Sequence, residues 1–257
     1  MCDNHCFCPS YRLCGVLQGF PALSRVQVHS GATGDLSLSV DGTQPLHIPS
    51  PSKASPHARY VLFGEDVAGE ELAEEPGKWF DAHFGTSGVR LVRRVNDAPR
   101  WGDVTAYDNS FADAAPVLLT SVASLRELNE WLAAAGTMQP ARMDRFRPNL
   151  VIGPAANPTS LPPWAEDEWI GKELCIGDAR FRVIAPCSRC SVVTIDQDTG
   201  EPDADGRVLW ELRKRRPSQR TRGLGSDQSP EFGVYLVPLN DATMQLGDGV
   251  SLAPGEL

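Results

Sequence analysis

Histidine is missing from most of this sequence. The 257-residue chain has five histidines, all between His5 and His83, and residues 84–257 contain none. Chemistry in the C-terminal two thirds must therefore proceed without imidazole, which excludes Ser-His-Asp triads, Cys-His pairs and His-containing zinc sites there. Lysine is also scarce, with four lysines against 20 arginines, so an isolated arginine carries little information.

Further absences narrow the class of protein. No apolar run approaches the roughly 20 residues of a membrane helix, so we expect no membrane span. The start of the sequence lacks the basic and apolar regions of a secretory signal, which favours a cytoplasmic location. Mitochondrial association stays open, although no clear targeting signal is present. A net charge of -9 argues against general nucleic-acid binding. Neither a Rossmann G-x-G-x-x-G loop nor a haem or flavin motif is found.

Short apolar runs between glycine and proline turns predict a mostly β fold of the α+β class. We expect an irregular segment at 1–20, a β-rich domain at 21–98 with a short helix at 76–85, and a larger domain at 99–257. The larger domain opens with the apolar run PVLLT and continues into the helix SVASLRELNEWLAAAG, capped by Ser121 or Ser124 and ended by Gly136.

The rest of the larger domain predicts strands, arranged as a barrel rather than a parallel sheet. KELCIGDARFRVIAP and TMQLGDGVSL each contain a Gly-Asp turn between apolar stretches, and SVVTID also favours a strand. The basic run at 211–223 lacks apolar periodicity and predicts a solvated loop, with docking to an acidic partner as a minor alternative.

The seven cysteines fall into two groups. Four lie near the start, at spacings that match no standard zinc site, and we interpret them as incidental. The other three lie in the larger domain, and the odd count favours free thiols in a reducing compartment. In chain order they are Cys2, Cys6, Cys8, Cys14, Cys175, Cys187 and Cys190.

The segment PCSRCSVVTID carries the most distinctive chemistry. Cys187 and Cys190 are two residues apart in a C-x-x-C pair, with Arg189 beside the second. A thioredoxin-like dithiol needs a helix after the pair, and a zinc site needs a second pair of ligands. A single thiolate ligand for a soft metal such as molybdenum, favoured by the arginine charge, is the third interpretation. Two buried thiols in a turn remain the simplest alternative.

Other residues could form an anion site. Ser121 lies where a strand passes into a helix, which suits a phosphate group, although a plain helix cap is the alternative. In MDRFRPN, Arg145 and Arg147 would lie on the same side of an extended segment, with Asn149 in phase. Two guanidinium groups suit a phosphate, and a solvated strand face is the alternative.

Four stretches of the sequence resemble the MOSC domain in their order and spacing. This is the C-terminal domain of molybdenum cofactor sulfurase and also occurs in the mitochondrial amidoxime-reducing component and its bacterial relatives. The resemblance covers residues 100–252, and residues 20–97 more weakly resemble the second half of the β-rich N-terminal domain that accompanies it. The four stretches are FADAAPVLLTSVASLRELN, RFRPNLVI, WAEDEWIGKELCIGDARFRVIAPCSRCSVVTIDQDTG and FGVYLVPLNDATMQLGDGVSL.

The resemblance implies a MOSC-type β-barrel domain that binds the molybdenum cofactor, preceded by a partial MOSC N-terminal domain. Cys190 matches the metal ligand, whereas Cys187 matches a less constrained position. Ser121, Arg147 and Asn149 match positions that look like contacts to the cofactor phosphate and pterin. Ser188, Arg189 and Thr194 are second choices for cofactor contacts because they lie near Cys190 in sequence.

The resemblance also implies an activity. The leading hypothesis is a molybdenum-dependent oxidoreductase that removes oxygen from N-hydroxylated compounds, with electrons from a separate electron-transfer protein. The alternative is a cofactor-binding or sulfur-carrier module without turnover, since the sulfurase domain works beside a pyridoxal-phosphate domain for which this chain has no room. The Pro-Val-Lys-Ser-Cys and Gly-Asp-Arg-Arg motifs of two-domain members do not occur here, which predicts a truncated sequence or a reduced cofactor clamp.

Overall fold

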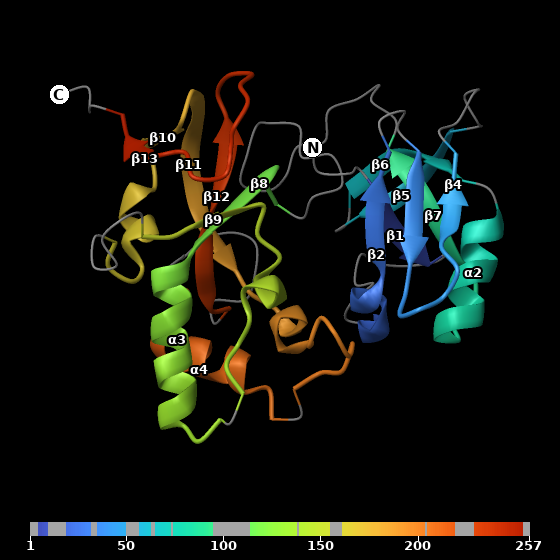
Figure 1. Cartoon of the computed structure of the whole chain (residues 1–257), viewed down its shortest axis with the longest axis horizontal. Coiled ribbons are helices and arrows are strands. Elements are labelled where there is room, and N and C mark those ends of the chain that lie inside the picture. Colours follow the sequence, from blue (N-terminus) through green and yellow to red (C-terminus); the bar gives the residue numbers. More distant parts are fainter. Residues whose placement is uncertain are drawn as a thin grey trace. The chain divides into compact units, whose positions relative to one another are not determined.

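The computed structural model describes eleven segments of the chain. They are residues 5–9, 19–31, 35–49, 57–62, 65–72, 74–94, 114–137, 139–154, 161–203, 205–218 and 229–253. The chain divides into two compact units, and Figure 1 follows it from blue to red. Unit 1 comprises Met1–Arg100 together with Ile195–Pro202, and unit 2 comprises Trp101–Thr194 together with Asp203–Leu257.

Within its described residues, unit 1 has two antiparallel sheets and the α-helix α2. The four-stranded sheet has the order β1 (His5–Pro9), β7 (Val89–Arg94), β6 (Glu65–Glu71), β5 (His57–Leu62). The three-stranded sheet has the order β2 (Gln27–Ser30), β3 (Leu36–Ser39), β4 (Leu46–Ile48). Helix α2 (Glu74–Phe84) buries Phe80 against leucines of β3 and β7. It ends at Gly85, whose positive φ and N–H bond to the Asp81 carbonyl close its last turn.

The helix expected at 76–85 is therefore confirmed, and so are the strands expected in this unit. The N-terminal segment differs from expectation, because β1 lies within the stretch that we expected to be irregular. Its pairing with β7 is long-range, from His5 opposite Arg93 to Pro9 opposite Val89. A pairing partner this far along the chain cannot be recognised from the local sequence around residues 5–9.

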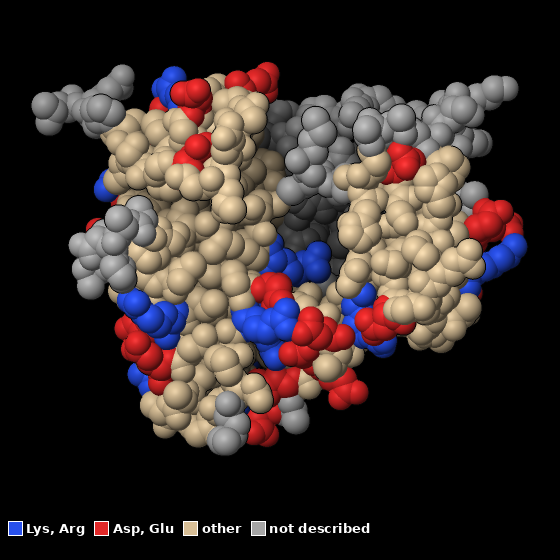
Figure 2. Space-filling view, viewed as in Figure 1, with Lys and Arg blue, Asp and Glu red and all other residues tan. Residues whose placement is uncertain are grey.

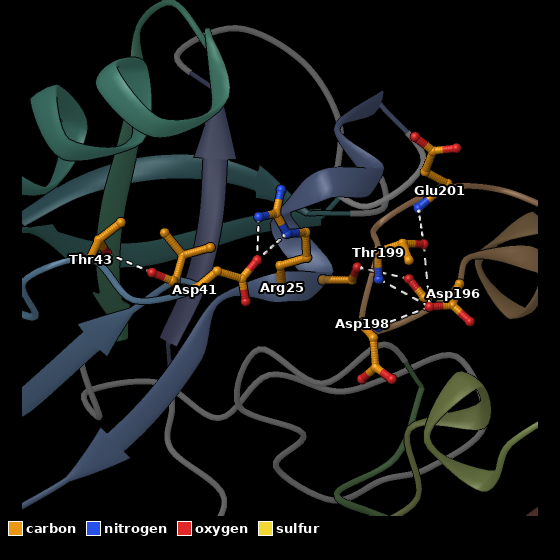
Figure 3. A network of polar contacts seen from close by, with 9 residues as sticks. Arg25, Asp41, Thr43, Asp196, Asp198, Thr199 and Glu201 are labelled. Carbon is orange, nitrogen blue, oxygen red and sulfur yellow. Dashed lines mark hydrogen bonds and ion pairs between the residues drawn. The ribbon is translucent and has the colours of Figure 1, made fainter.

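An eight-residue excursion from the larger half of the sequence belongs to unit 1. Within it, the Asp196 side chain accepts hydrogen bonds from the backbone N–H groups of Asp198 and Thr199 at 3.0 Å each, as Figure 3 shows. The Asp196 carbonyl accepts from the Ser24 hydroxyl at 3.4 Å, beside the Arg25–Asp41 ion pair. The chain thus leaves unit 2 directly after Thr194 and returns at Asp203.

Unit 2 is built on one six-stranded sheet, which curls into a half-barrel (Figure 1). All neighbouring strands are antiparallel except β8 and β9, which are parallel. The inner core contains side chains from five of the strands, including Leu119, Leu174 and Val234. The order is β13 (Val250–Leu252), β10 (Glu173–Ile176), β11 (Ala179–Ser188), β12 (Glu231–Pro238), β8 (Val117–Ser121), β9 (Leu150–Ile152).

A second core lies between this sheet and the helical elements. It joins Phe232 of β12 to leucines of α3 (Val122–Ala134) and α4 (Arg207–Arg215), and to Phe146 and Val193 of two short 3-10 helices. These are η2 (Met143–Phe146) and η4 (Ser191–Thr194). The α3 helix is capped by Ser121, whose hydroxyl oxygen accepts from the Ala123 and Ser124 N–H groups, as one of the two expected caps.

Three expectations for this unit are wrong, the first of them in part. Residues 211–215 of the basic run lie within α4 rather than in a loop, because Val208, Leu209 and Leu212 supply the buried face, and residues 219–223 of the run lie outside the described residues. SVVTID forms η4 and a single bridge in place of a strand. Only Val250–Leu252 of TMQLGDGVSL is a strand, since the Asp248 carboxylate bonds to the Gln245 N–H and folds the preceding residues into a turn.

The hairpin expected at Gly177-Asp178 is confirmed, because Ile176 pairs with Ala179 across it. Among the residues that the structure describes, no helix is both long and apolar enough to cross a lipid bilayer.

A buried carboxyl group joins α3 to the short 3-10 helix η3 (Ala165–Trp169). The Glu166 side chain is fully buried, and Oε1 accepts from the Ser124 hydroxyl at 2.7 Å. The Ser124 oxygen in turn accepts from the Trp164 N–H at 2.9 Å, while Glu166 Oε2 has no partner among the described residues. Burial raises the pKa of Glu166 above its ordinary value of 4.5, because the ionised form has lost its hydration.

Gly233 of β12 is expected to be intolerant of any side chain. Its φ is +76°, and a Cβ there would lie 2.5 Å from the Leu119 carbonyl oxygen. The replacement Gly233→Ala should lower the free energy of unfolding by about 3 kcal/mol, measured by urea denaturation. Gly136→Ala, at φ +83° with open space, should cost only about 1 kcal/mol. Equal losses in the two variants would contradict this account.

The raised pKa of Glu166 predicts a pH-dependent loss of stability. The folded carboxyl keeps its proton at pH values where the unfolded one has lost it, so the free energy of unfolding falls as pH rises above about 4.5. Glu166→Gln cannot ionise, and the difference in stability between variant and wild type should grow in favour of the variant across that range. Thermal unfolding scans at a series of pH values measure this difference; a difference independent of pH would refute it.

Candidate functional site

The candidate metal ligand lies at one end of the curled sheet, directly after β11. Strand β11 ends at Ser188 and η4 begins at Ser191, so Cys190 occupies the short connection between them. Its side chain is exposed and forms no hydrogen bond with the described residues. The connection thus presents an available thiol to the exterior.

Cys187, the other member of the C-x-x-C pair, has a different environment. It is 3% exposed, and its thiol donates to the Ser188 carbonyl oxygen with a sulfur–oxygen distance of 3.6 Å. Neither cysteine forms a disulfide. Because one thiol faces the interior and the other the exterior, the geometry does not favour a dithiol pair. Among the described residues there is also no group of three or more metal-binding side chains, which a zinc site would need.

Arg189 lies between the two cysteines and its side chain turns inward. Nε and Nη2 both donate to the Phe232 carbonyl oxygen, at 2.9 and 2.6 Å, and Nη1 donates to the Phe146 carbonyl oxygen at 3.0 Å. The guanidinium carbon is 5.5 Å from the centre of the Phe146 ring and 5.9 Å from that of Phe232. These contacts join β12, η2 and the Cys190 connection.

An irregularity in the sheet makes one of these carbonyl groups available. Pro186 pairs with Val234 and Ser188 pairs with Glu231, so two residues of β12 lie opposite Cys187 alone. This β-bulge consists of Phe232 and Gly233, and it interrupts the regular ladder of hydrogen bonds. The Phe232 carbonyl oxygen can therefore accept from Arg189.

Arg147 is exposed and follows immediately after the second carbonyl group. It ends η2 in the left-handed conformation, with φ 53° and ψ 47°, and its N–H donates to the Asp144 carbonyl oxygen. The Arg189 side chain, which donates to the Phe146 carbonyl oxygen, thus joins the segment that carries the exposed Arg147 to the connection that carries the exposed Cys190.

The expectation that Arg145 and Arg147 lie on the same side of an extended segment is wrong. Residues 143–146 form a 3-10 helix, which ends the alternation of a strand. Arg145 instead donates through Nη1 to the Thr194 carbonyl oxygen at 2.9 Å, so that it joins η2 to η4. Of this pair, Arg147 is exposed and Arg145 is half-buried.

Asn149 bonds to the edge of the sheet. Its N–H donates to the Leu118 carbonyl oxygen at 2.9 Å, and its Oδ1 accepts from the Leu118 N–H at 2.7 Å. One residue thus extends the parallel pairing of β8 and β9. It also fixes the position of the segment that carries Arg147.

The other expected site residues have structural contacts. Ser121 is fully buried as the cap of α3, at the end of β8. Thr194 is buried, and its hydroxyl donates to the Ser191 carbonyl oxygen at 2.7 Å within η4. Ser188 is half-buried at the end of β11, opposite Glu231. Of all the expected residues, only Cys190, Arg147 and Asn149 are exposed.

A cluster of aromatic rings supports the site, and the sequence analysis did not find it. Phe146 stacks on Phe232 with ring centres 3.9 Å apart, and the edge of Trp164 packs on Phe232 at 5.6 Å. Trp131 of α3 stacks on Trp164, and the Arg216 guanidinium lies 4.4 Å from the centre of the Trp164 ring. These four rings come from four separate segments of the sequence, so no local pattern connects them.

Charge alone does not mark the site. Over unit 2 in Figure 2, basic and acidic side chains lie next to one another on the helix-rich part, and the strands show mainly uncharged surface. On this face no patch of one charge covers the strands, and the exposed Arg147 is a single basic side chain that an anionic ligand could contact.

Comparison with known proteins identifies relatives of the chain. Rat mitochondrial amidoxime reducing component 2 is 30% identical over 230 residues, which cover 84% of this chain and 62% of the relative. Human mitochondrial amidoxime-reducing component 1 is 31% identical over 232 residues, covering 84% and 63%. Molybdenum cofactor sulfurase of Anopheles gambiae is 32% identical over 147 residues, covering 55% and 18%. The chain thus spans less than two thirds of the length of these relatives.

Residues 106–251 match the MOSC domain family. The matched region includes β8, the Arg147 segment, both cysteines of the C-x-x-C pair and β12. Because the match extends over more than half of the sequence, this chain belongs to the MOSC domain family.

Proposed function

We propose that this protein binds the molybdenum cofactor and reduces N-hydroxylated compounds with electrons from a separate donor protein. The observation that carries the proposal is the exposed, unpartnered Cys190 thiol, with the exposed Arg147 on a segment that an Arg189 hydrogen bond joins to the Cys190 connection, in a chain related to amidoxime-reducing components and molybdenum cofactor sulfurases. A thiolate and a cation match the needs of a soft metal held by an anionic pterin.

The donor chemistry of the site fits this cofactor. Cys190 offers one soft sulfur ligand, and the buried Cys187 leaves it without a competing second thiol. Arg147 offers a guanidinium whose parallel N–H groups can hold a phosphate. Asn149 would hold the arginine segment against β8, and Ser121, Ser188 and Thr194 would support the backbone around the ligand.

The bound cofactor would supply two-electron redox chemistry and accept an oxygen atom. In the overall reaction the N–O bond of the substrate is broken, two electrons and two protons are taken up, and water is released. The residues of the chain would hold the cofactor and leave the exposed side of Cys190 accessible to a small molecule. Because Cys187 is buried and Cys190 is exposed, the C-x-x-C pair is not arranged to provide the electron pair as a dithiol, which favours an external donor.

A cofactor-binding or sulfur-carrier module without turnover is the second candidate. It is favoured by the match to a molybdenum cofactor sulfurase over 147 residues, a length close to that of the MOSC region. The same thiol and cation would serve either function, so activity decides between them.

We also propose that unit 1 corresponds to the N-terminal domain of the relatives, since their matches cover 84% of the chain and extend beyond the MOSC region. The cytoplasmic location stays a prediction.

Replacement of the ligand tests the proposal. Cys190→Ser exchanges a soft sulfur for a hard oxygen and should remove both bound molybdenum and the reduction of benzamidoxime by an artificial donor. Cys187→Ser should retain both, because that thiol is buried. The measurements are metal analysis of the purified protein and product formation.

The outcomes separate the candidates. Molybdenum near one per chain with activity supports the reductase, and molybdenum without activity supports the binding module. Zinc in place of molybdenum, or equal loss in the two cysteine variants, would exclude a single thiolate ligand for molybdenum.

The cation is tested by Arg147→Asn, which removes the charge but keeps a residue that tolerates positive φ. We expect the molybdopterin content after gel filtration to fall by about tenfold, because a charge-assisted contact to phosphate is lost. Arg213→Asn, an exposed arginine on α4, is the matched control and should leave the content unchanged. A comparable loss in the two variants would show a general effect of charge rather than a phosphate contact.

A further inference from the structure

We infer that Arg189 is a positioning residue. Its contacts inside the protein hold Cys190 and Arg147 at a constant spacing, and it does not bind the cofactor itself. The inference rests on the proposed cofactor site. It differs from the sequence expectation, which placed Arg189 among the cofactor contacts. The geometry of the guanidinium group carries the argument.

The guanidinium is directed at the protein. Arg189 is 9% exposed, and its three nitrogen atoms all donate to two backbone carbonyl groups. The rings of Phe146 and Phe232, both fully buried, lie against it and separate it from water. An arginine that contacts a bound phosphate would instead present part of its fork to the exterior, as the exposed Arg147 can.

The two carbonyl groups are ones that the fold leaves without regular partners. The Phe232 carbonyl lies in the β-bulge of β12, and the Phe146 carbonyl ends η2 just before the left-handed Arg147. An unpaired buried carbonyl is costly, and a planar group with diverging donors can satisfy both at once. Lysine has one ammonium group in place of the planar guanidinium, and methionine has no hydrogen-bond donor, so neither can make all these contacts.

The consequence for the site follows from the chain connectivity. Cys190 is bonded to Arg189, and Arg147 is bonded to Phe146, so the hydrogen bond of 3.0 Å from the Arg189 side chain to the Phe146 carbonyl oxygen joins the two segments and restrains their separation. The Arg145 contact to Thr194 joins the same two segments on the other side of η4. A cofactor that is held at both its metal and its phosphate requires this separation to be constant.

The charge of Arg189 has no acidic counterpart. None of the described residues forms an ion pair with it, and its stabilisation comes from carbonyl dipoles and ring faces. A buried cation without an acid is retained at a cost in stability.

The test begins with the full-length, cofactor-free protein. Arg189→Met should speed amide hydrogen exchange by about tenfold or more in residues 145–149 and 187–194 together, and Arg189→Lys should give a smaller increase in both. Leu212→Ala removes a fully buried side chain from the same core but leaves the guanidinium contacts, so it should not single out these two segments. Exchange that rises in one segment only, or equally in the control, overturns the inference.

A second measurement uses the cofactor and a double-mutant cycle. Arg189→Met should speed molybdopterin release by about tenfold when Arg147 is present and by much less in the Arg147→Asn background, because Arg189 acts through Arg147. Leu212→Ala should change release equally in both backgrounds. Equal effects of Arg189→Met in the two backgrounds would contradict a positioning role.

These measurements also separate the two proposals. If the wild-type protein holds no molybdopterin, the proposed function fails, whereas the exchange experiment still decides on Arg189. If Arg189→Met does not fold, Arg189→Lys decides the matter: wild-type exchange in both segments would overturn the inference, and a joint increase would support it.

Discussion

The hydrogen bonds of one buried guanidinium determine how the candidate site is assembled. Arg189 links the bulged start of β12 to the end of η2; the exposed Cys190 follows Arg189 itself, and the exposed Arg147 follows the end of η2. The aromatic pair around it keeps water away, which strengthens each bond to a carbonyl dipole. The separation of thiol and cation is therefore set by the interior of unit 2 and not by the surface loops that display them.

Unusual backbone conformations are concentrated around this centre. Arg147 and Trp164 are the two described non-glycine residues with positive φ, and Gly233 needs positive φ within the bulge. Each such conformation at a non-glycine residue costs about 1–3 kcal/mol and persists only where its surroundings enforce it. Here the surroundings are the stacked rings, the bond from the Trp164 N–H to Ser124 and the contact of Arg189 with Phe146. A site held by strained but fully bonded backbone is well ordered before a ligand arrives.

Local signals in the sequence predicted the elements but not the contacts that build the site. Ser121 before an apolar 3.6-residue pattern marked α3, and Gly177-Asp178 between alternating runs marked the β10–β11 hairpin, because both signals lie within a few residues. The basic run alone predicts a loop, because the apolar residues Val208 and Leu209, which give α4 its buried face, lie just upstream of it. Arg145 and Arg189 were grouped with Arg147 as anion contacts, since nothing local distinguishes an arginine that bonds to distant carbonyl groups from one that faces solvent.

The inward turn of Arg189 also sharpens the interpretation of the C-x-x-C pair. In a dithiol the two sulfur atoms must approach each other, but here the residue between them is anchored in the core, with Cys187 buried on β11 and Cys190 exposed beyond its end. Bringing the thiols together would require breaking the three bonds of Arg189, two of them to the carbonyl group in the bulge. The same contacts that favour a single external thiolate therefore disfavour disulfide chemistry, and the two cysteines have separate roles although only two residues lie between them.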